Sequence, residues 1–126
     1  MNTNEIKVLM VEPGKHPRVT TLGNDLDSLQ KAVSIGADYQ GLIEIISIGN
    51  GDCLLCNEEG KLIGLEGNRR LGDDIIVGVF YIMSEDEDGN LVSLSEQKIQ
   101  HYMKRFWEPE VFDQAEIEAS ILFRFF

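Results

Sequence analysis

The stretch Ile75-Ile76-Val77-Gly78-Val79-Phe80-Tyr81-Ile82-Met83 is the most strand-like segment of this chain. Its β-branched and aromatic residues favour extended backbone, and an apolar run of this kind is typical of a strand that is covered on both faces. The run is too short to cross a bilayer, which takes about 20 apolar residues. We therefore predict a strand over residues 75–83 at the centre of a sheet.

Shorter apolar segments predict the other strands of this sheet. The turn Gly49-Asn50-Gly51 favours a hairpin, because glycine and asparagine tolerate positive φ. Both alternating faces of residues 42–48 are mostly apolar, so we expect that strand to be covered on both sides. Residues 66–74 are expected to form a loop, and residues 84–90 an acidic turn. The predicted strands are residues 6–11, 19–22, 42–48, 52–56 and 61–65, with consecutive hairpins linking the last three.

Three segments contain side chains that can begin a helix by accepting backbone N–H bonds. Asn24 or Asp25 precedes a short amphipathic segment that Gly36 ends. Ser95 precedes a second amphipathic segment, and Asp113 precedes a third. We therefore predict two or three helices, each with one apolar face that must pack against the sheet.

The length of the chain limits the architecture. A chain of 126 residues suits one domain, which buries about two thirds of the surface of the unfolded chain. It is too short for two complete hydrophobic cores. The predicted fold is a single α+β domain over residues 1–126, with a mixed, mainly antiparallel sheet of four to six strands and two or three helices packed on one face.

The charge balance is strongly acidic, with 22 Asp and Glu against 11 Lys and Arg and a formal net charge of −11. Such a surface repels phosphate backbones, so direct binding to DNA or RNA is disfavoured, while a basic protein partner is favoured. The hydrophobic fraction of 43% is too high for a disordered chain. Residues 1–5 carry no secretory signal, so we expect a cytoplasmic protein that does not insert into a membrane.

Cys53 and Cys56 form a Cys-x-x-Cys motif inside a predicted strand. Residues three apart on a strand point to opposite faces, which suits neither a redox disulfide nor a shared metal ion. A zinc site would need two further ligands, and His16 and His101 lie in distant segments. We expect two buried or half-buried thiols, with no metal and no cofactor.

Residues 84–96 match part of a calcium-binding loop. Asp86, Asp88 and Gly89 have the required spacing, but Ser95 stands where the bidentate glutamate belongs, and a strand replaces the incoming helix. We therefore expect a solvated acidic turn at this place.

Asn68, Arg69 and Arg70 form the only local basic patch that the sequence indicates. Two guanidinium groups in a loop flanked by glycines could bind a carboxylate or a phosphate, or could form salt bridges with carboxylates of the same chain. The segment Glu12-Pro13-Gly14-Lys15-His16 is not a phosphate-binding loop, because it lacks the earlier glycine and the hydroxyl residue. His16 could act as a base near Glu12, but the sequence offers no nucleophile.

The opening Val8-Leu9-Met10-Val11-Glu12-Pro13 followed by Gly14-Lys15 resembles the start of the domain-of-unknown-function family 3846. The resemblance extends over most of the chain up to Phe106, with departures at residues 69–74 and after Glu110. It implies a bacterial origin near plasmids, phages or conjugative elements, and implies no activity. The other similar segments are residues 56–62 (Cys-Asn-Glu-Glu-Gly-Lys-Leu), Asn68-Arg69, residues 74–80 (Asp-Ile-Ile-Val-Gly-Val-Phe) and residues 93–97 (Ser-Leu-Ser-Glu-Gln).

Two functions remain after these exclusions. The first is a non-enzymatic accessory or regulatory factor of a mobile element, which binds a basic protein and could mimic nucleic acid. Its surface would be the acidic turn of Glu85, Asp86, Glu87 and Asp88.

The alternative is a small-molecule or nucleotide-binding module, with at most a modest enzymatic activity. Its ligand-binding residues would be Asn68, Arg69 and Arg70 together with Glu12, Lys15 and His16.

The assembly is predicted to be a monomer or a homodimer. Residues 121–126 contain five apolar residues in six and either pack on the same domain or join two copies.

Overall fold

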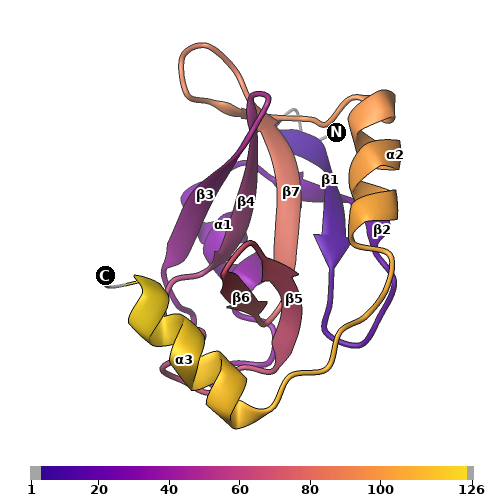
Figure 1. Cartoon of the computed structure of the whole chain (residues 1–126). Coiled ribbons are helices and arrows are strands. Elements are labelled where there is room, and N and C mark those ends of the chain that lie inside the picture. The colour runs from indigo at the N-terminus through magenta and orange to yellow at the C-terminus, as the bar shows by residue number, and fades with distance from the viewer. Residues whose placement is uncertain (1–3, 125–126) are drawn as a thin grey trace.

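Six strands form one antiparallel sheet in the order β2-β1-β7-β4-β3, with β8 beside β7 (Figure 1). The computed structural model describes residues 4–124, with side chains as far as residue 121. A separate pair of antiparallel strands, β5 (Gly67–Leu71) and β6 (Asp74–Val77), forms a second, smaller sheet. The strands of the main sheet are β1 (Glu5–Val11), β2 (Arg18–Gly23), β3 (Ile43–Gly49), β4 (Asp52–Asn57), β7 (Phe80–Glu85) and β8 (Leu91–Val92). The predicted α+β class and strand number are confirmed.

The helices lie on both faces of the main sheet. Val8 and Met10 of β1 pack on one face with α1 (Leu26–Val33), whereas Leu9 of β1 packs on the other with α2 (Glu96–Arg105). The expectation that the helices share one face is therefore wrong. Successive residues of the central strands are apolar, so both faces must be covered.

The predicted central strand breaks at Gly78. Residues 75–77 belong to β6 in the small sheet, and only β7 runs through the centre of the main sheet. Gly78 has a φ of 72°, and its N–H donates to the carbonyl of Glu66 over 2.7 Å. A residue with a side chain rarely adopts this backbone conformation, so the single glycine lets the chain change sheets.

The segment between β4 and β6 differs from the prediction in two places. Residues 61–65 form no strand: residues 61–64 form turns, and the Leu65 N–H donates to the carbonyl of Gly60. The expected loop at residues 66–74 contains β5, whose Leu71 pairs with Asp74 of β6 in a tight hairpin. The hairpin forms because its apolar residues pack under a third helix, a contact that no local pattern indicates.

The strand predicted to be covered on both sides, β3, is an edge strand. It pairs only with β4 among the described strands, and its residues are half-buried or exposed. Both faces of β3 thus carry aliphatic side chains, but at the edge of the sheet these side chains are not fully buried.

The three helix starts are confirmed. Asp25 accepts the N–H of Ser28 at the start of α1, and Ser95 accepts the N–H of Lys98 at the start of α2. Asp113 accepts the N–H of Glu116 over 2.8 Å at the start of α3 (Gln114–Arg124).

The third helix packs on the small sheet. Ile117 of α3 lies in one cluster with Ile75 and Val77 of β6. The predicted tail falls partly in this helix, while the side chains of residues 122–126 lie outside the described part. No helix in the described residues is long and apolar enough to span a membrane.

Candidate functional site

Arg69 joins three segments that are far apart in the sequence. Its side chain is 1% exposed, and β5 directs it inward. Its Nη2 donates to the carbonyl of Lys15 over 2.6 Å, and its Nε donates to the carbonyl of Phe106 over 3.0 Å. Its Nη1 donates to Asn68 Oδ1 over 2.8 Å. The guanidinium is thus the centre of a clasp between the β1–β2 loop, the end of α2 and the small sheet.

Asn68 completes this clasp. It is fully buried, and its Nδ2 donates to the carbonyls of Val11 and Gly78, both over 2.8 Å. Its amide therefore ties β1 to the point where the chain passes from β6 to β7. Arg69 forms no ion pair among the described residues, so carbonyl and amide oxygens alone solvate the buried charge.

Burial lowers the pKa of the Arg69 guanidinium, and the carboxylates of Glu110 and Glu108 partly oppose that change. An arginine starts so far above neutral pH that the group stays charged. A buried cation with its donors directed to backbone oxygens stabilises a loop arrangement, and few of its donors remain for a ligand.

His16 lies at the outer end of the clasp. Its ring stacks on the indole of Trp107, with ring centroids 4.0 Å apart and an interplanar angle of 9°. His16 Nδ1 lies 2.6 Å from the carbonyl oxygen of Trp107; because a carbonyl only accepts, Nδ1 carries the proton. The charged side chains at the two ends of this loop are paired: Glu12 binds Arg18 of β2 over 2.7 Å and Lys15 over 3.6 Å.

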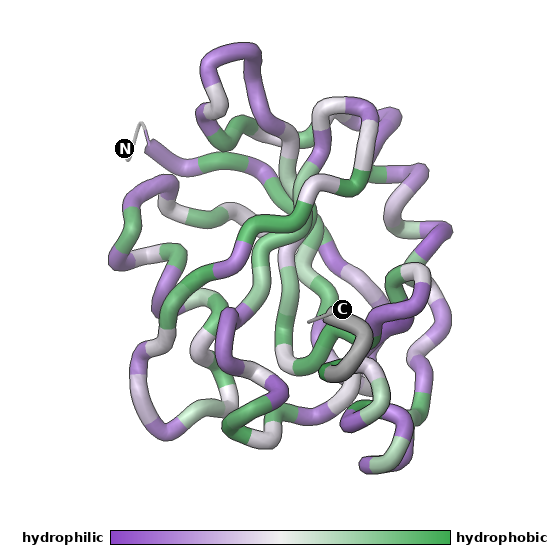
Figure 2. Tube along the Cα trace, turned by 60° about the vertical axis from the view of Figure 1, so that its left-hand side comes forward, coloured by the Kyte–Doolittle hydropathy of each residue, from purple (hydrophilic) through white to green (hydrophobic). Residues whose placement is uncertain are grey.

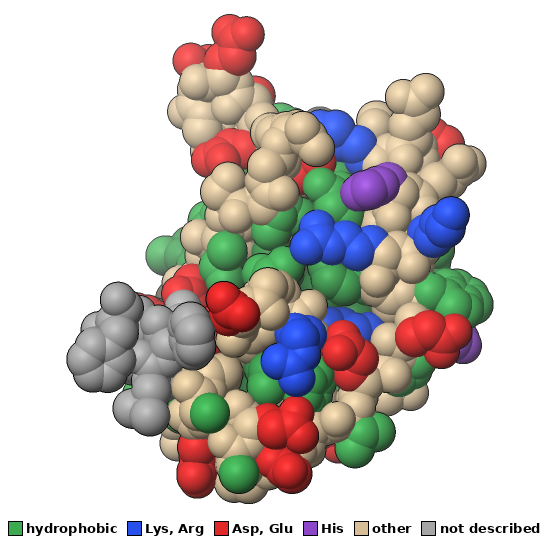
Figure 3. All heavy atoms as spheres, in the orientation of Figure 1, with side chains coloured by type: hydrophobic (Ala, Val, Ile, Leu, Met, Phe, Trp, Pro, Cys, Tyr) green, Lys and Arg blue, Asp and Glu red, His purple; other side chains and the backbone are tan. Residues whose placement is uncertain are grey.

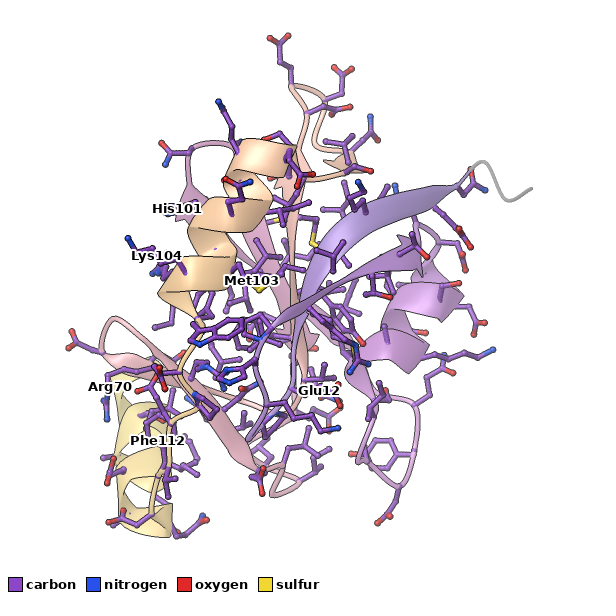
Figure 4. The ribbon with its side chains drawn as sticks, turned by 90° about the vertical axis from the view of Figure 1, so that its right-hand side faces the viewer. Glu12, Arg70, His101, Met103, Lys104 and Phe112 are labelled. Carbon is purple, nitrogen blue, oxygen red and sulfur yellow. The ribbon has the colours of Figure 1, made fainter. Side chains whose placement is uncertain are left out.

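The structure therefore brings the predicted ligand-binding residues together, but as packing partners. The cavities of about 480 and 330 Å³ in the described part are not lined by Arg69 or His16, although Glu12 lines the smaller one. Arg70 points outward instead. Its guanidinium lies 5.3 Å from the ring centre of Phe112 and pairs with Glu116 over 3.3 Å. Figure 4 shows Arg70 near Phe112.

The acidic turn between β7 and β8 projects beyond the end of the main sheet (Figure 1), and Figure 3 shows acidic side chains at its tip. Glu85, Asp86, Glu87 and Asp88 are all exposed. No salt bridge to these four carboxylates occurs among the described residues. The β7–β8 loop thus presents uncompensated negative charge to solvent.

Asp86 holds this loop in one shape. Its carboxylate accepts the backbone N–H of Asn90 over 2.8 Å and that of Asp88 over 3.0 Å. These hydrogen bonds, the one from Asn90 first, lower the pKa of Asp86. The loop is also anchored to the neighbouring hairpin, because the Glu85 N–H donates to the carbonyl of Gly51 over 2.8 Å. Asp86 therefore builds the turn, while Glu85, Glu87 and Asp88 form its charged surface.

A buried polar cluster around Asp52 was not predicted. Asp52 is 2% exposed and accepts hydrogen bonds from Ser84 Oγ (2.8 Å), Lys98 Nζ (2.7 Å) and Tyr102 Oη (2.6 Å). Lys98 and Tyr102 are four residues apart, so their shared helix face was visible in the sequence. Their partner on β4 was not, because tertiary folding alone brings it near.

Burial, hydrogen bonds and charges within this cluster lower the pKa of Asp52 and raise that of Tyr102. Burial alone would raise the pKa of Asp52, but the hydrogen bonds from Lys98, Tyr102 and Ser84 outweigh it and lower that pKa. Burial and the Asp52 carboxylate raise the pKa of Tyr102 to about 12. The hydrogen bonds from Lys98 and Tyr102 of α2 to Asp52 of β4 fix α2 to the sheet.

The two cysteines lie on opposite faces of β4, as predicted. Cys53 belongs to the cluster under α1 and Cys56 to the cluster under α2; both are buried and neither forms a disulfide, and the Cys56 thiol donates to Glu44 Oε1 over 3.6 Å. Burial, with the charges of Glu85 and Asp52, raises the pKa of Cys53 to about 11, which suppresses its thiolate at neutral pH. Among the side chains that the structure describes, no three of His, Cys, Asp or Glu gather in a group that could hold a metal ion.

A sequence model of the domain of unknown function (DUF3846) matches residues 6–107, which is more than half of the chain. The chain belongs to this family. The resemblance noted at Val8–Pro13 is thereby confirmed. No curated protein and no solved structure was found to match the chain.

In this DUF3846 protein the match covers the clasp, the β7–β8 loop and the Asp52 cluster, whereas α3 lies beyond it. The matched part also contains a basic helix face that the sequence did not indicate. His101 and Lys104 lie on the outer side of α2 and Met103 lies toward the sheet in Figure 4, and blue and purple side chains gather there in Figure 3. The acidic surplus is therefore distributed unevenly, with the β7–β8 loop at one extreme and α2 at the other.

Proposed function

We propose that this DUF3846 protein is a non-enzymatic binding protein, an accessory or regulatory factor of a mobile element, whose β7–β8 loop binds a basic protein partner. The observation that carries the proposal is the shape of the loop. Three exposed carboxylates, those of Glu85, Glu87 and Asp88, stand on a turn that Asp86 holds in place. A preorganised loop loses little conformational entropy on binding, so more of its electrostatic attraction contributes to affinity.

The charge of the loop suits a basic partner for two reasons. Its carboxylates lack salt bridges within the described chain, so they remain available to external Lys and Arg side chains. The net charge of −11 adds long-range attraction for a basic surface. Closely spaced carboxylates on a protruding loop also support a role as a nucleic-acid mimic that occupies a DNA-binding surface.

The small-molecule alternative has less support. Asn68 and Arg69 direct their donors to protein oxygens, and the carboxylate of Glu12 is shared between Lys15 and Arg18. Of Arg69 and Arg70, only Arg70 keeps an exposed guanidinium, and this group already pairs with Glu116.

The experiment is affinity capture from the source cells with three tagged baits. The test bait carries Glu85→Gln, Glu87→Gln and Asp88→Asn, which removes three charges and keeps the turn-forming Asp86. The control bait removes three exposed carboxylates elsewhere, through Glu5→Gln, Asp38→Asn and Glu118→Gln. Captured proteins are quantified by mass spectrometry at about 0.15 and 0.5 M salt, where screening differs strongly.

We expect the wild type and the control to capture the same basic protein. The test bait should capture about tenfold less, since each exposed ion pair contributes about 0.5 kcal/mol. Equal capture by the test bait would contradict the proposal. A different result would be salt-sensitive binding of the purified protein to duplex DNA that is lost on Lys104→Gln and Arg105→Gln. That result would contradict the proposal and assign DNA binding to α2.

A further inference from the structure

The outer edge of β3 has hydrogen-bonding groups that the sheet does not use. In an antiparallel pair, each residue directs both its N–H and its C=O to the same side, and the side alternates along the strand. The Glu58 N–H donates to the carbonyl of Leu42 over 2.9 Å, so the backbone groups of Leu42 point toward β4. Ile43, Ile45 and Ser47 therefore direct their backbone groups away from β4, toward the margin of the sheet.

The β4–β7 ladder gives the same alternation independently. Gly51 accepts the N–H of Glu85, so Gly51, and with it Cys53 and Leu55, direct their groups toward β7. Leu54, which lies between Cys53 and Leu55, directs its groups toward β3, where its register partner is Ile46. The backbone N–H and C=O of Ile46 thus point toward β4, and those of Ile45 point away from it, in agreement with the first observation.

The two edges of the main sheet differ in side-chain character. The β2 edge contains Arg18 and consecutive threonines, which are typical of a protected edge. The β3 edge has the sequence Ile-Glu-Ile-Ile-Ser-Ile-Gly, with one charged residue and no proline, and Ile45 is 47% exposed. In Figure 2 this strand crosses the front of the molecule and no segment passes before it. Such an edge is suited to pairing with another strand.

The surroundings of β3 are acidic at both ends. The turn that follows β3 is hydrogen-bonded to Glu85, so the β7–β8 loop stands beside this end of the edge. Glu58 and Glu59 directly follow β4 and stand beside the other end. A second copy of the chain paired antiparallel on β3 would place its own β7–β8 loop near Glu58 and Glu59, and like charges would oppose that arrangement. A strand with basic side chains meets opposite charge instead.

We propose that β3 accepts an extended segment of the partner protein as an added antiparallel strand, through the outward backbone groups of Ile43, Ile45 and Ser47. The segment has aliphatic residues that pack on the exposed isoleucines, and Lys or Arg where it passes the β7–β8 loop. Main-chain hydrogen bonds supply affinity, and the side chains supply specificity. The choice of a basic partner rests on the proposed function, whereas the pairing at the edge does not.

The test uses a displayed library of random peptides of about 14 residues, which is long enough to span β3. We expect selection on the wild type to enrich alternating aliphatic residues with a basic group at one end. The best peptide is then measured by fluorescence anisotropy. Ile45→Pro removes one outward N–H and should weaken binding at least tenfold, while the control Ile45→Val keeps that N–H and should change binding less than threefold.

Folding of Ile45→Pro is checked by circular dichroism and by amide exchange of the buried strands. A copy of the peptide that is N-methylated at alternate amides provides the second test, because it needs no protein variant. Methylation on the side that faces β3 should abolish binding, and methylation on the other side should not.

The outcomes separate the two proposals. Absence of enriched peptides, or equal binding to Ile45→Pro, overturns the strand addition and leaves the β7–β8 loop as the proposed site. Loss on Ile45→Pro without loss on the loop variant retains the strand addition and contradicts the proposed function. A dimer that Ile45→Pro dissociates would assign the edge to a second copy and overturn the assignment to a partner.

Discussion

At the scale of single residues, Arg69 shows that a buried charged side chain can hold separate segments of the chain together. Its guanidinium reaches backbone oxygens of the β1–β2 loop and the end of α2 from the small sheet. The fixed planar fork of an arginine can donate in several directions at once, which a lysine ammonium on a flexible stem does less well. The residue therefore joins three segments through backbone oxygens, next to the apolar cluster that Ile76 and Phe106 share.

We predict that Arg69→Lys lowers the free energy of unfolding by about 2–4 kcal/mol, because it leaves buried carbonyl groups without donors. Arg70→Lys is the matched control: Arg70 is exposed, and we expect a change below about 0.5 kcal/mol. Urea denaturation followed by tryptophan fluorescence gives both values, since Trp107 stacks on His16 next to the clasp. Equal effects of the two substitutions would show that Arg69 is not a structural centre.

At the scale of elements, Gly78 decides how one apolar run is divided between two sheets. The residues before it pair with β5, and those after it pair with β1 and β4. A Cβ on Gly78 would lie 2.7 Å from Leu65 Cδ1. The turn therefore requires glycine for its backbone conformation and also for the close approach of Leu65.

We predict that Gly78→Ala costs about 2 kcal/mol of unfolding free energy, from a strained φ and a displaced Leu65. Gly14→Ala separates these causes, because Gly14 has a similar φ of 74° but open space around its Cα. It should cost only about 1 kcal/mol. Thermal denaturation of both variants tests the difference. Equal melting temperatures would mean that Leu65 moves aside without cost.

At the scale of the whole molecule, the two faces of the sheet are held by different polar contacts beside their apolar clusters. On the α1 face, Tyr81 and Asn57 donate to the carbonyls of Ala32 and Val33, while the α2 face contains the Asp52 cluster with its buried carboxylate. Since α2 also supplies the carbonyl that Arg69 binds, its position affects the clasp as well. The loss of stability at acidic pH should therefore depend on Asp52.

We predict that wild-type stability falls as pH decreases below about 4, and that Asp52→Asn lacks part of this fall. The pKa of Asp52 in the folded protein lies below its ordinary value of 3.8, so protons bind the unfolded chain more readily. The contribution of Asp52 is complete above that value and is lost as pH falls through the lower, folded value. Urea denaturation from pH 7 to pH 2 should show a constant difference between wild type and variant down to pH 4, and a shrinking one below. A difference that grows on acidification would contradict the assignment.

Much of the fold could be predicted because it depends on local chemistry. Asp25, Ser95 and Asp113 begin the three helices through hydrogen bonds within one turn of the chain. The opposite faces of Cys53 and Cys56 follow from the two-residue period of a strand. The residues near the clasp were also identified, although their buried contacts could not be inferred from the sequence.

The α+β class, the helix starts, the acidic turn and the family could be predicted from the sequence, because each depends on neighbouring residues. The edge position of β3, the helices on opposite faces, and the burial of Arg69 and Asp52 emerged only in the folded molecule. Strand order, burial and long-range hydrogen bonds depend on segments tens of residues apart. The free energy of those contacts, such as Arg69 with Lys15, arises only when the whole chain has folded.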